Sequence, residues 1–366
     1  MFATPTAQMD SAAPSPDSPR APLEVRTARP EDRARWEAFL AGRTDSRVFQ
    51  RAAWLDAVGQ VFGHGDRSLL AWRGDDLVGV LPMMKCRGLG GRTHLISTPY
   101  GTLGGPCSAD DDVMRELVER GMRHAEREDV GRLELRCERQ LDVAGLLHSD
   151  LYVNFSREIP ADFDGILKAM KKDERRLVRR AADKHGLELS EGAWFVDDLA
   201  RLFHESKRGL GSPGLPIAWF HALQDKLGDA CVVHMVRRGV EPLAVSMGFV
   251  HGDTYHMYYI GTAPHANREY TATSFMIARL QEWCIERGIA RYDLGRSRGD
   301  AGTASFKRNQ GFEPQPLAYS YHCVNSDGLP SFNPSNPRTE LLRKTWSRMP
   351  AWIARRLSTP LAKRLP

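Results

Sequence analysis

The chain of 366 residues is 42% hydrophobic and 27% charged, a composition typical of a globular protein with a core large enough for two domains. No stretch approaches the roughly 18 consecutive apolar residues that a membrane-spanning helix needs, which excludes such a helix. The six cysteines are scattered without a CxxC pair, so we expect neither disulfides nor a metal cluster, and a reducing cytoplasm as the compartment.

The formal net charge of +5 is unevenly distributed. Residues 338–366 hold eight Lys/Arg and one Glu, a local charge of +7, which leaves −2 for the rest of the chain. A second basic segment, residues 168–184, holds eight Lys/Arg and three acids. Clusters of positive charge favour an anionic partner, although two solvated helix faces would have the same composition. Both interpretations stay open from composition alone.

In chain order, the N-terminal segment comes first. Residues 1–23 are rich in Ala, Pro and Ser and have no continuous apolar run, so we expect a disordered tail and no signal peptide. A helical segment is expected over residues 30–60. It is followed by a β-hairpin over residues 68–85, whose polar turn is Gly74-Asp75-Asp76, and by a third strand that begins at Thr93.

The same order of elements occurs a second time. Residues 231–251 predict another hairpin, in which Arg238 stands where Arg73 stood, and another third strand begins at Thr254. Amphipathic helices are expected next over residues 111–128 and 272–287, each ended by a glycine and followed at once by a strand. Because Arg73 and Arg238 are 165 positions apart, the pattern indicates a doubled domain and not a short solenoid repeat.

Each half is expected to finish with a short helix and a last strand. In the first half these are residues 141–148 and 151–159, and in the second half residues 303–309 and 316–323. A long helical segment over residues 163–226 opens the second half. Three strands, a helix, a central strand, a short helix and a final strand make a mixed α/β pattern with both strand directions.

That order is the one used by GNAT-type acyltransferases, and three motifs narrow the resemblance. STPYGTLGGP (97–106), KKDERRLVRRAADKHGL (171–187) and YDLGRSRGDAGTASFKRNQGFEP (292–314) resemble segments of the Fem-like (FemAB) proteins associated with exosortase/PEP-CTERM systems. Those are tandem GNAT proteins with BioF2-like acetyltransferase domains, related to the peptidyltransferases that add amino acids to peptidoglycan precursors. The resemblance covers residues 25–366, and the last motif is its most specific part.

The resemblance implies a division of the chain into four parts. After the tail (1–23), it implies a first GNAT-like domain over residues 24–159 with a structural role and a second over residues 160–325 that bears the active site. Residues 326–366 would form a basic, helical C-terminal extension. The first half lacks the Gly-Arg-Ser and Phe-Lys elements of the last motif, so we expect it to contribute only walls to the site.

The loop that would bind the donor departs from the ordinary GNAT pattern. Ordinary GNAT enzymes hold the CoA pyrophosphate in a glycine-rich loop at a helix N-terminus, and the corresponding residues 261–275 lack those glycines. Thr271 or Thr273 can still cap that helix and leave free amides for an anion. The resemblance therefore implies acyl transfer, with acyl-CoA or aminoacyl-tRNA as the donor and no metal.

Lys307 and Phe306 are the first candidate catalytic residues. By resemblance, Lys307 lies against the donor ester or its leaving oxygen, where a positive charge stabilises the oxyanion, and Phe306 is a wall of the site. The alternative is a surface lysine beside a core phenylalanine. Asp293, in the central strand, is expected to orient Arg296 or Lys307, with proton abstraction from the nucleophile as its other role.

Tyr258 completes the candidate catalytic set. Either Tyr258 or its neighbour Tyr259 must point toward the cleft, since side chains alternate along a strand, and the alternation alone does not decide between them. His251 and His256 are five positions apart across a turn, but a metal pair needs a third ligand and the sequence offers none, so a metal site is not expected.

The candidate substrate-binding residues form two groups. Arg296, Ser297 and Thr303 follow the end of the central strand, where α/β proteins often bind ligands, and Arg296 can hold a phosphate or carboxylate through two hydrogen bonds. A salt bridge from Arg296 to a nearby aspartate is the alternative. The second group lies on the basic helix within residues 168–184, where by resemblance it contacts a nucleotide-sugar diphosphate, a lipid-linked diphosphate or a tRNA backbone: Arg175, Arg176 and Arg179.

The C-terminal segment combines aromatic and apolar side chains with cations. Trp346, Trp352, Ile353 and Leu357 lie among seven Lys/Arg of residues 341–366, a composition that suits a helix at a membrane interface. A helix docked on the second domain would have the same composition. Both alternatives remain open, and the first would place the protein at the inner face of the membrane.

Together these features predict a cytoplasmic acyltransferase. It would move an acetyl, other acyl or aminoacyl group onto an amine or hydroxyl of a cell-envelope polysaccharide or its precursor, in an exopolysaccharide pathway linked to PEP-CTERM proteins. The alternative is a protein without catalytic activity that uses the GNAT scaffold to bind a polyanion such as nucleic acid. The basic helix lacks interleaved aromatic residues, which disfavours specific recognition of single strands.

Overall fold

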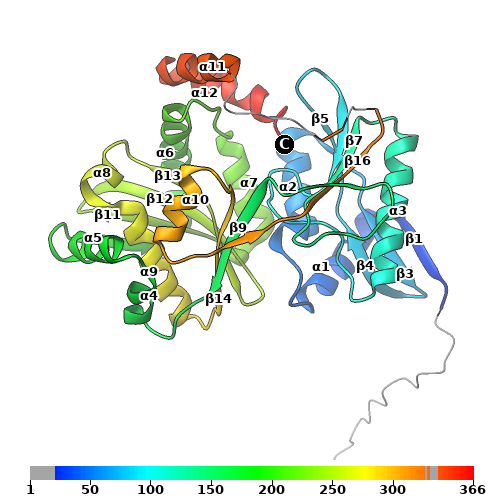
Figure 1. Ribbon diagram of the computed structural model, residues 1–366, viewed down its shortest axis with the longest axis horizontal. Helices are drawn as coiled ribbons and strands as arrows, with labels where there is room; N and C mark the ends of the chain where they lie inside the picture. The colour runs from blue at the N-terminus through cyan, green and yellow to red at the C-terminus, as the bar shows by residue number, and fades with distance from the viewer. Residues whose placement is uncertain (1–20, 326–327, 330–336) are drawn as a thin grey trace, which may run out of the picture.

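The computed structural model describes residues 21–325, 328–329 and 337–366, so the predicted N-terminal tail up to residue 20 and part of the expected C-terminal extension lie outside the described residues. The protein is a mixed α/β fold whose two halves lie side by side (Figure 1). The first half, in blue and cyan, is on the right of the figure, and the second half, mainly green and yellow, is on the left.

The first half contains a three-stranded sheet in the order β1-β3-β4 and a six-stranded sheet in the order β2-β5-β6-β7-β16-β8. Its own strands are β1 (Leu23–Thr27), β2 (Gly65–Asp66), β3 (Leu69–Arg73), β4 (Asp76–Leu81), β5 (Met84–Arg87), β6 (Thr93–Ile96), β7 (Arg132–Leu135) and β8 (Leu147–Ser149). Its helices are α1 (Arg33–Ala41), α2 (Ala52–Phe62) and α3 (Asp111–Arg127).

The second half is built on one seven-stranded sheet in the order β10-β11-β12-β13-β14-β9-β15. The strands that follow β8 along the chain are β9 (Tyr152–Glu158), β10 (Leu187–Glu191), β11 (Cys231–Arg238), β12 (Glu241–His251), β13 (Thr254–Thr262), β14 (Arg291–Arg298), β15 (Pro314–Pro316) and β16 (Tyr319–Cys323). The helices are α4 (Phe163–Ala169), α5 (Lys172–Asp183), α6 (Val196–Gly209), α7 (Ile217–Leu227), α8 (Ala266–Tyr270), α9 (Ala272–Glu286), α10 (Gly302–Asn309), α11 (Pro337–Arg348) and α12 (Ala351–Ala362).

The two predicted hairpins are confirmed and have equivalent turns. β3 pairs with β4, and β11 pairs with β12, both antiparallel. Gly74 and Gly239 close the two turns with φ angles of 60° and 58°, a left-handed conformation that glycine adopts without strain. Each half also contains one parallel strand pair, β6 beside β7 in the first and β13 beside β14 in the second. The duplication read from the sequence is therefore a duplication of structure.

The halves exchange their last strands. β9, at the end of the first half, lies between β14 and β15 in the sheet of the second half. β16, at the end of the second half, lies between β7 and β8 in the sheet of the first half. The boundary predicted at residues 159 and 160 stays a prediction about the chain, but the hydrogen-bonded sheets extend across it.

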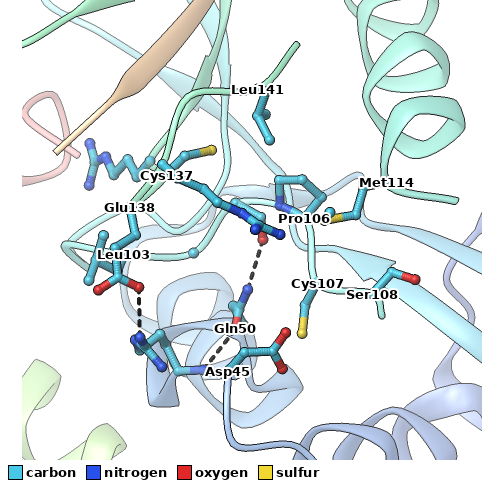
Figure 2. Close-up of a pocket in the computed structure, with 15 residues that line it drawn as sticks. Asp45, Gln50, Leu103, Pro106, Cys107, Ser108, Met114, Cys137, Glu138 and Leu141 are labelled. Carbon is cyan, nitrogen blue, oxygen red and sulfur yellow. Dashed lines mark hydrogen bonds and ion pairs between the residues drawn. The ribbon is translucent and has the colours of Figure 1, made fainter. Parts of the chain in front are cut away.

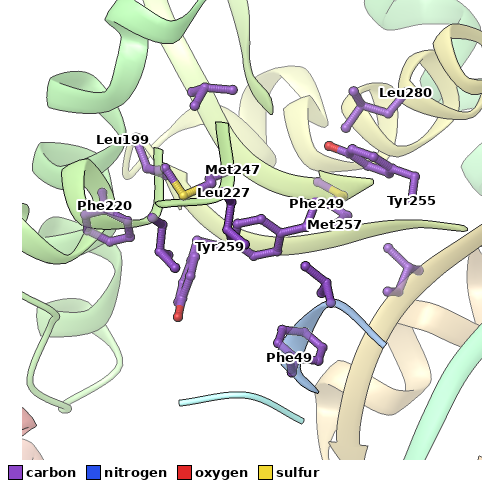
Figure 3. Packing of buried hydrophobic residues seen from close by; sticks show 14 of the residues in the cluster. Phe49, Leu199, Phe220, Leu227, Met247, Phe249, Tyr255, Met257, Tyr259 and Leu280 are labelled. Atoms are coloured by element: carbon purple, nitrogen blue, oxygen red, sulfur yellow. The ribbon is translucent and has the colours of Figure 1, made fainter. Parts of the chain in front are cut away.

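One large apolar core also joins the halves. On α2, Trp54 places its ring 5.4 Å from the ring of Trp219 on α7 and 5.5 Å from that of Phe249 on β12. Phe49, which precedes α2, lies beside Phe249 in this same core (Figure 3). Because aromatic side chains bury large apolar areas, these contacts make the interface part of the protein interior.

Three expected elements differ from the structure in detail. Residues 141–148 form no helix, and their end belongs to the short strand β8, which pairs with β16. Leu147 in β8 is 45% exposed, so backbone pairing with β16, and not burial of an apolar helix face, decides the local structure. The segment expected to be helical over residues 163–226 is interrupted by β10, an edge strand that pairs with β11. The strand expected over residues 316–323 is divided into β15 and β16.

The C-terminal helices pack on the second half. Both α11 and α12 contact α6 (Figure 1), and Ala354, Ser358 and Ala362 on α12 are buried. The docked alternative for this segment is therefore the observed arrangement. In the described part of the chain, no helix has both the length and the apolar character needed to cross a bilayer.

Candidate active site

The candidate site lies where β13 and β14 separate. The two strands pair only between residues 254–256 and 291–293. Just beyond, Gly295 has a φ angle of 70° and the register between β14 and β9 shifts between Asp293 and Arg296. A bulge of this kind bends a strand and changes the direction of its side chains. The candidate residues of the last motif therefore lie at or just after the bulge near the end of β14.

Asp293 is buried at the base of this separation. Its carboxylate accepts hydrogen bonds from the Asn154 side chain on β9, at 2.9 Å, and from the Gly295 amide, and it lies 3.6 Å from Nδ1 of His256. Burial opposes its charge, but His256 and then these two donors outweigh burial and lower the pKa of Asp293. Nε2 of His256 is buried and has no hydrogen-bond partner among the described residues.

Lys307 reaches the same bulge from α10. Its Nζ donates to the carbonyl oxygens of Gly295, at 2.8 Å, and Arg296, at 3.1 Å, and lies 5.2 Å from the ring of Phe155. Burial lowers the pKa of Lys307 to about 8. The ammonium therefore points into the protein and not into solvent. Its neighbour Phe306 is partly buried and packs against the core, and its role as a wall of the site stays a prediction.

Arg296 interacts with tyrosines rather than with acids. Its guanidinium donates to the hydroxyl of Tyr319, at 2.8 Å, and stacks 4.6 Å from the ring centre of Tyr152. The salt bridge that was the alternative for Arg296 is instead made by Arg298, which pairs with Asp300 at 3.2 Å. Ser297 is buried in β14 and Thr303 is exposed in the first turn of α10.

Tyr258 points toward the first half. Its hydroxyl donates to the carbonyl oxygen of Tyr100, at 2.6 Å, whereas Tyr259 points the opposite way and accepts from Trp219. Tyr100 belongs to the loop of residues 97–106, the first of the three motifs. In this loop Tyr100 has a φ angle of 63°, a conformation costly for a residue with a side chain. The strained loop therefore covers the separated strands from the first half.

The first half also places a buried ion pair at this interface, which the sequence reasoning missed. Arg136 donates to Glu134 at 2.9 Å and to the carbonyl oxygens of Thr98 and Gly101 in the same loop. Burial opposes ionisation, but the guanidinium of Arg136 keeps the pKa of Glu134 below its ordinary value. The internal repeat could have pointed to Glu134, because Glu134 stands in β7 where Asp293 stands in β14: each pairs with the parallel neighbouring strand, β6 or β13.

A cavity of about 370 Å³ lies in the first half, close to this loop (Figure 2). Gln50 crosses its wall and donates to the carbonyl oxygen of Gly105 at 2.9 Å, and Arg47 pairs with Glu138 at 2.7 Å. Cys107, Met114 and other residues of the loop and of α3 line the rest. The first half thus has a cavity of its own, and the expectation that it supplies only walls to the site stays a prediction.

A second cavity, of about 350 Å³, lies between the halves. Arg47 and Glu138 line it from the first half, and His256, Arg291 and Asp293 line it from the second. It is the cavity that brings the predicted Asp293 to open space. His251, next to it, is bonded to Ser46 at 2.7 Å, and no group of three or more metal-binding side chains occurs among the described residues.

The three candidate arginines of α5 are used differently. Arg175 donates to the carbonyl oxygens of Leu167, Lys168 and Met170 at the end of α4, at 2.8–3.2 Å. Arg176 and Arg179 are exposed and lie 3.8 Å and 4.0 Å from acidic side chains. The geometry therefore gives Arg175 a structural task, and its role in binding substrate stays a prediction, as do those of Arg176 and Arg179.

The N-terminus of α9 differs from the expected anion site. Thr271 occupies the N-cap position but its side chain makes no capping bond, and the amide of Thr273 is capped by Asn267 at 2.9 Å. On the next residue, the hydroxyl of Ser274 donates to the carboxylate of Glu174 at 2.8 Å. A negative charge from α5 thus lies beside the first turn of α9, where it disfavours an anion at this helix N-terminus.

These features define a class of protein. The chain forms a tandem GNAT-like fold of two equivalent halves. Each half has a hairpin and a parallel strand pair that separates, and a helix connects the two paired strands along the chain. Residues 168–308 match the family model described as an acetyltransferase (GNAT) domain. The chain therefore carries a GNAT acyltransferase domain in its second half, the half that holds Asp293, Arg296 and Lys307.

Solved structures extend the fold likeness to both halves. FemX has a TM-score of 0.65 at 13% identity, over 87% of this chain and 100% of FemX. L-PGS from Bacillus licheniformis has a TM-score of 0.50 at 14% identity, over 88% and 97% of the two chains. The C-terminal domain of a putative lysylphosphatidylglycerol synthetase from Agrobacterium fabrum has 0.50 at 14%, over 80% and 92%. At identities this low, the structural likeness shows a shared fold and no more. No curated protein matches the chain significantly in sequence.

Proposed function

We propose that the protein transfers an acyl or aminoacyl group from an activated ester to an amine or hydroxyl of a cell-envelope polysaccharide or its precursor, on the cytoplasmic side. The observation that carries the proposal is the inward-facing ammonium of Lys307 at the bulge of β14, within a GNAT acyltransferase domain. The C-terminal domain of a putative lysylphosphatidylglycerol synthetase has a similar fold, and its name, which joins an amino acid to a lipid, supports aminoacyl transfer. The polysaccharide and the link to PEP-CTERM proteins rest on the motif resemblance.

Lys307 is suited to stabilise the oxyanion. An ammonium group has three N–H donors, and two of them bind the carbonyl oxygens of Gly295 and Arg296. The third remains for the oxygen of the ester carbonyl when the nucleophile attacks. Because these bonds fix the ammonium in a water-poor setting before the substrate arrives, its charge acts with little reorganisation.

His256 and Asp293 are suited to handle the proton of the nucleophile. Asp293 faces Nδ1 of His256 and leaves Nε2 unpaired next to the cavity between the halves. In the proposed step the amine or hydroxyl forms a bond to the carbonyl carbon and its proton passes to Nε2. The ester C–O bond then breaks, and the leaving oxygen takes that proton from Nε2, which returns His256 to its neutral form. Asp293 then acts on His256 and not on Arg296 or Lys307.

The setting of α9 favours aminoacyl-tRNA over acyl-CoA as the donor. The carboxylate of Glu174 is bonded to Ser274 and to Gln310 beside the N-terminus of α9. The pyrophosphate of CoA would meet this negative charge, whereas a tRNA ester needs only its 3′ end at the bulge. The exposed Arg176 and Arg179 on α5 are then available for phosphates of the tRNA or of a diphosphate-linked acceptor.

A donor and acceptor matrix tests the proposal. Labelled aminoacyl-tRNAs and acyl-CoAs would be offered with nucleotide-sugars and lipid-linked diphosphate sugars, and product followed by mass spectrometry. We expect transfer from a tRNA ester, a loss of about 10²–10³-fold in kcat for Lys307→Ala, and near-normal kcat for Arg308→Ala, an exposed neighbour on α10. Equal rates for both variants would remove Lys307 from the mechanism. Salt-dependent polyanion binding without transfer by the wild type would favour the non-catalytic alternative.

A further inference from the structure

We propose that the outer face of α11 and α12 binds the surface of an anionic lipid bilayer. The surface consists of the exposed side chains of these two helices, defined below. This inference goes beyond acyl transfer and does not depend on it, because the helices lie apart from the bulge of β14. In Figure 1 they lie along one edge of the molecule, above α6.

The inner side of the two helices is firmly attached to the protein. Ser358 on α12 accepts a hydrogen bond from the Gly214 amide at 3.0 Å, and the hydroxyl of Tyr100 donates to the carbonyl oxygen of Ala362, also at 3.0 Å. Where α11 gives way to α12, Arg208 on α6 donates to the carbonyl oxygens of Ser347 and Met349. The helices are therefore a fixed platform and not a free tail.

The outer side exposes large apolar side chains. Leu341 and Leu342 on α11 are 68% and 70% exposed, and Trp352 on α12 is 71% exposed. Leu210, whose carbonyl oxygen accepts from Arg343, is exposed next to α11. Single exposed apolar residues are ordinary, but a group on two adjoining helices marks an interaction surface.

The cations share that side. On α12, Trp352 is followed at helical spacing by Arg356, and both are exposed, while Ala354, Ser358 and Ala362 are buried. On α11, Lys344 and Arg348 follow Leu341 in the same way. From residue 340 to residue 366 the sequence holds seven Lys/Arg and a single acid, Glu340, which is paired with Lys344.

This combination fits a bilayer better than a nucleic acid. Leucine and tryptophan side chains bury no apolar area against the phosphate backbone of a nucleic acid. On a bilayer they enter the boundary between headgroups and acyl chains, and the cations lie at the anionic headgroups. Each basic residue close to such a surface raises the affinity about fivefold. Binding should therefore be reversible, dependent on anionic lipid and weakened by salt.

Vesicle flotation with the full-length protein tests the proposal. Vesicles of pure phosphatidylcholine are compared with vesicles containing about a third phosphatidylglycerol, at low and moderate salt. We expect flotation with the anionic vesicles and little with the neutral ones. The triple variant Leu341→Ser/Leu342→Ser/Trp352→Ala and the double variant Arg348→Glu/Arg356→Glu should each reduce binding more than tenfold.

The matched control is Arg115→Glu/Arg127→Glu, which makes the same charge change on exposed positions of α3 in the first half. We expect it to bind anionic vesicles as the wild type does. Circular dichroism and thermal denaturation of each variant would show that the platform still folds. Equal flotation with both kinds of vesicle, no flotation, equal loss in the α3 control, or displacement of the vesicles by tRNA would each overturn the proposal.

Discussion

At the scale of single residues, the bulge of β14 explains why the last motif is so rich in glycine and cations. Gly295 takes the left-handed backbone conformation, Asp293 accepts its amide, and Lys307 binds the carbonyl oxygen of the same residue. The two charged side chains therefore hold the backbone of one residue, Asp293 at its N–H and Lys307 at its carbonyl oxygen. The glycine gives the bend, and the charges fix it in a single geometry.

The titration of Lys307 gives a prediction about pH. Its pKa in the folded protein is about 8, below the ordinary value, so its ammonium is lost as the pH rises through about 8. If the ammonium stabilises the oxyanion, kcat of the wild type falls above pH 8. Lys307→Arg should retain activity there, since a guanidinium stays protonated.

A kcat profile from pH 6 to pH 10 would measure this effect. A decline that is the same in wild type and in Lys307→Arg would assign the titration to another group. The control for alkaline loss of structure is the far-ultraviolet circular dichroism of both proteins at each pH.

Asp293 gives a second prediction at this scale. Asp293→Asn removes the carboxylate that faces His256 but keeps the size of the side chain, so we expect kcat to fall about 10²-fold with little change in KM. Asp300→Asn breaks only the exposed pair with Arg298 and should leave kcat within about twofold. Steady-state kinetics of the two variants decide the matter, and a rise in KM alone for Asp293→Asn would contradict the proposed role.

At the scale of elements, the basic helix α5 shows how one motif serves two purposes. Its apolar stripe packs on α9, and Val178 and Ala181 are buried there. Arg175 faces inward and binds the carbonyl oxygens that end α4, while Arg176 and Arg179 face solvent. A run of arginines that looks uniform in sequence is thus divided by the helical period.

That division predicts different effects on stability. Arg175→Ala leaves three carbonyl oxygens at the end of α4 without their partner and should lower the free energy of unfolding by about 1–2 kcal/mol. Arg176→Ala, on the exposed side of the same helix, should change it by less than about 0.5 kcal/mol. Urea denaturation of the two variants measures both values, and equal stabilities would mean that the bonds to α4 contribute nothing.

At the scale of the whole molecule, the exchange of β9 and β16 makes the two halves one folding unit. Each sheet has its neighbour's last strand in an interior position, and the core continues from Trp54 to Trp219 across the interface. Removing either half would leave a gap within a sheet and an exposed aromatic surface. A cooperative domain cannot lose an interior strand and keep its free energy of folding.

We therefore predict that the full chain unfolds in one transition and that residues 21–159 and 160–366, produced separately, do not fold. Calorimetry of the full chain and circular dichroism with hydrogen exchange of the two fragments would test this. Co-expression of the fragments should restore a folded complex. A fragment with cooperative unfolding of its own would show that the exchanged strand is dispensable.

Sequence by itself determined much of this protein. The doubled order of strands and helices, the hairpin turns at Gly74 and Gly239 and the helix α10 follow from local patterns, since periodicity and turn residues act over a few positions. Lys307 was singled out by the motif resemblance. The helix that the sequence predicted over residues 141–148 does not form, because strand pairing dominates there.

Only the tertiary structure decided which residues meet Asp293. Asn154 is 139 positions away along the chain and reaches it because β9 crosses into the other sheet. His256, Tyr100 and the pair of Glu134 and Arg136 come to the interface in the same way, and Glu174 reaches α9 from another helix. Such contacts depend on the path of the chain through space, and local preference of the residues holds no information about that path.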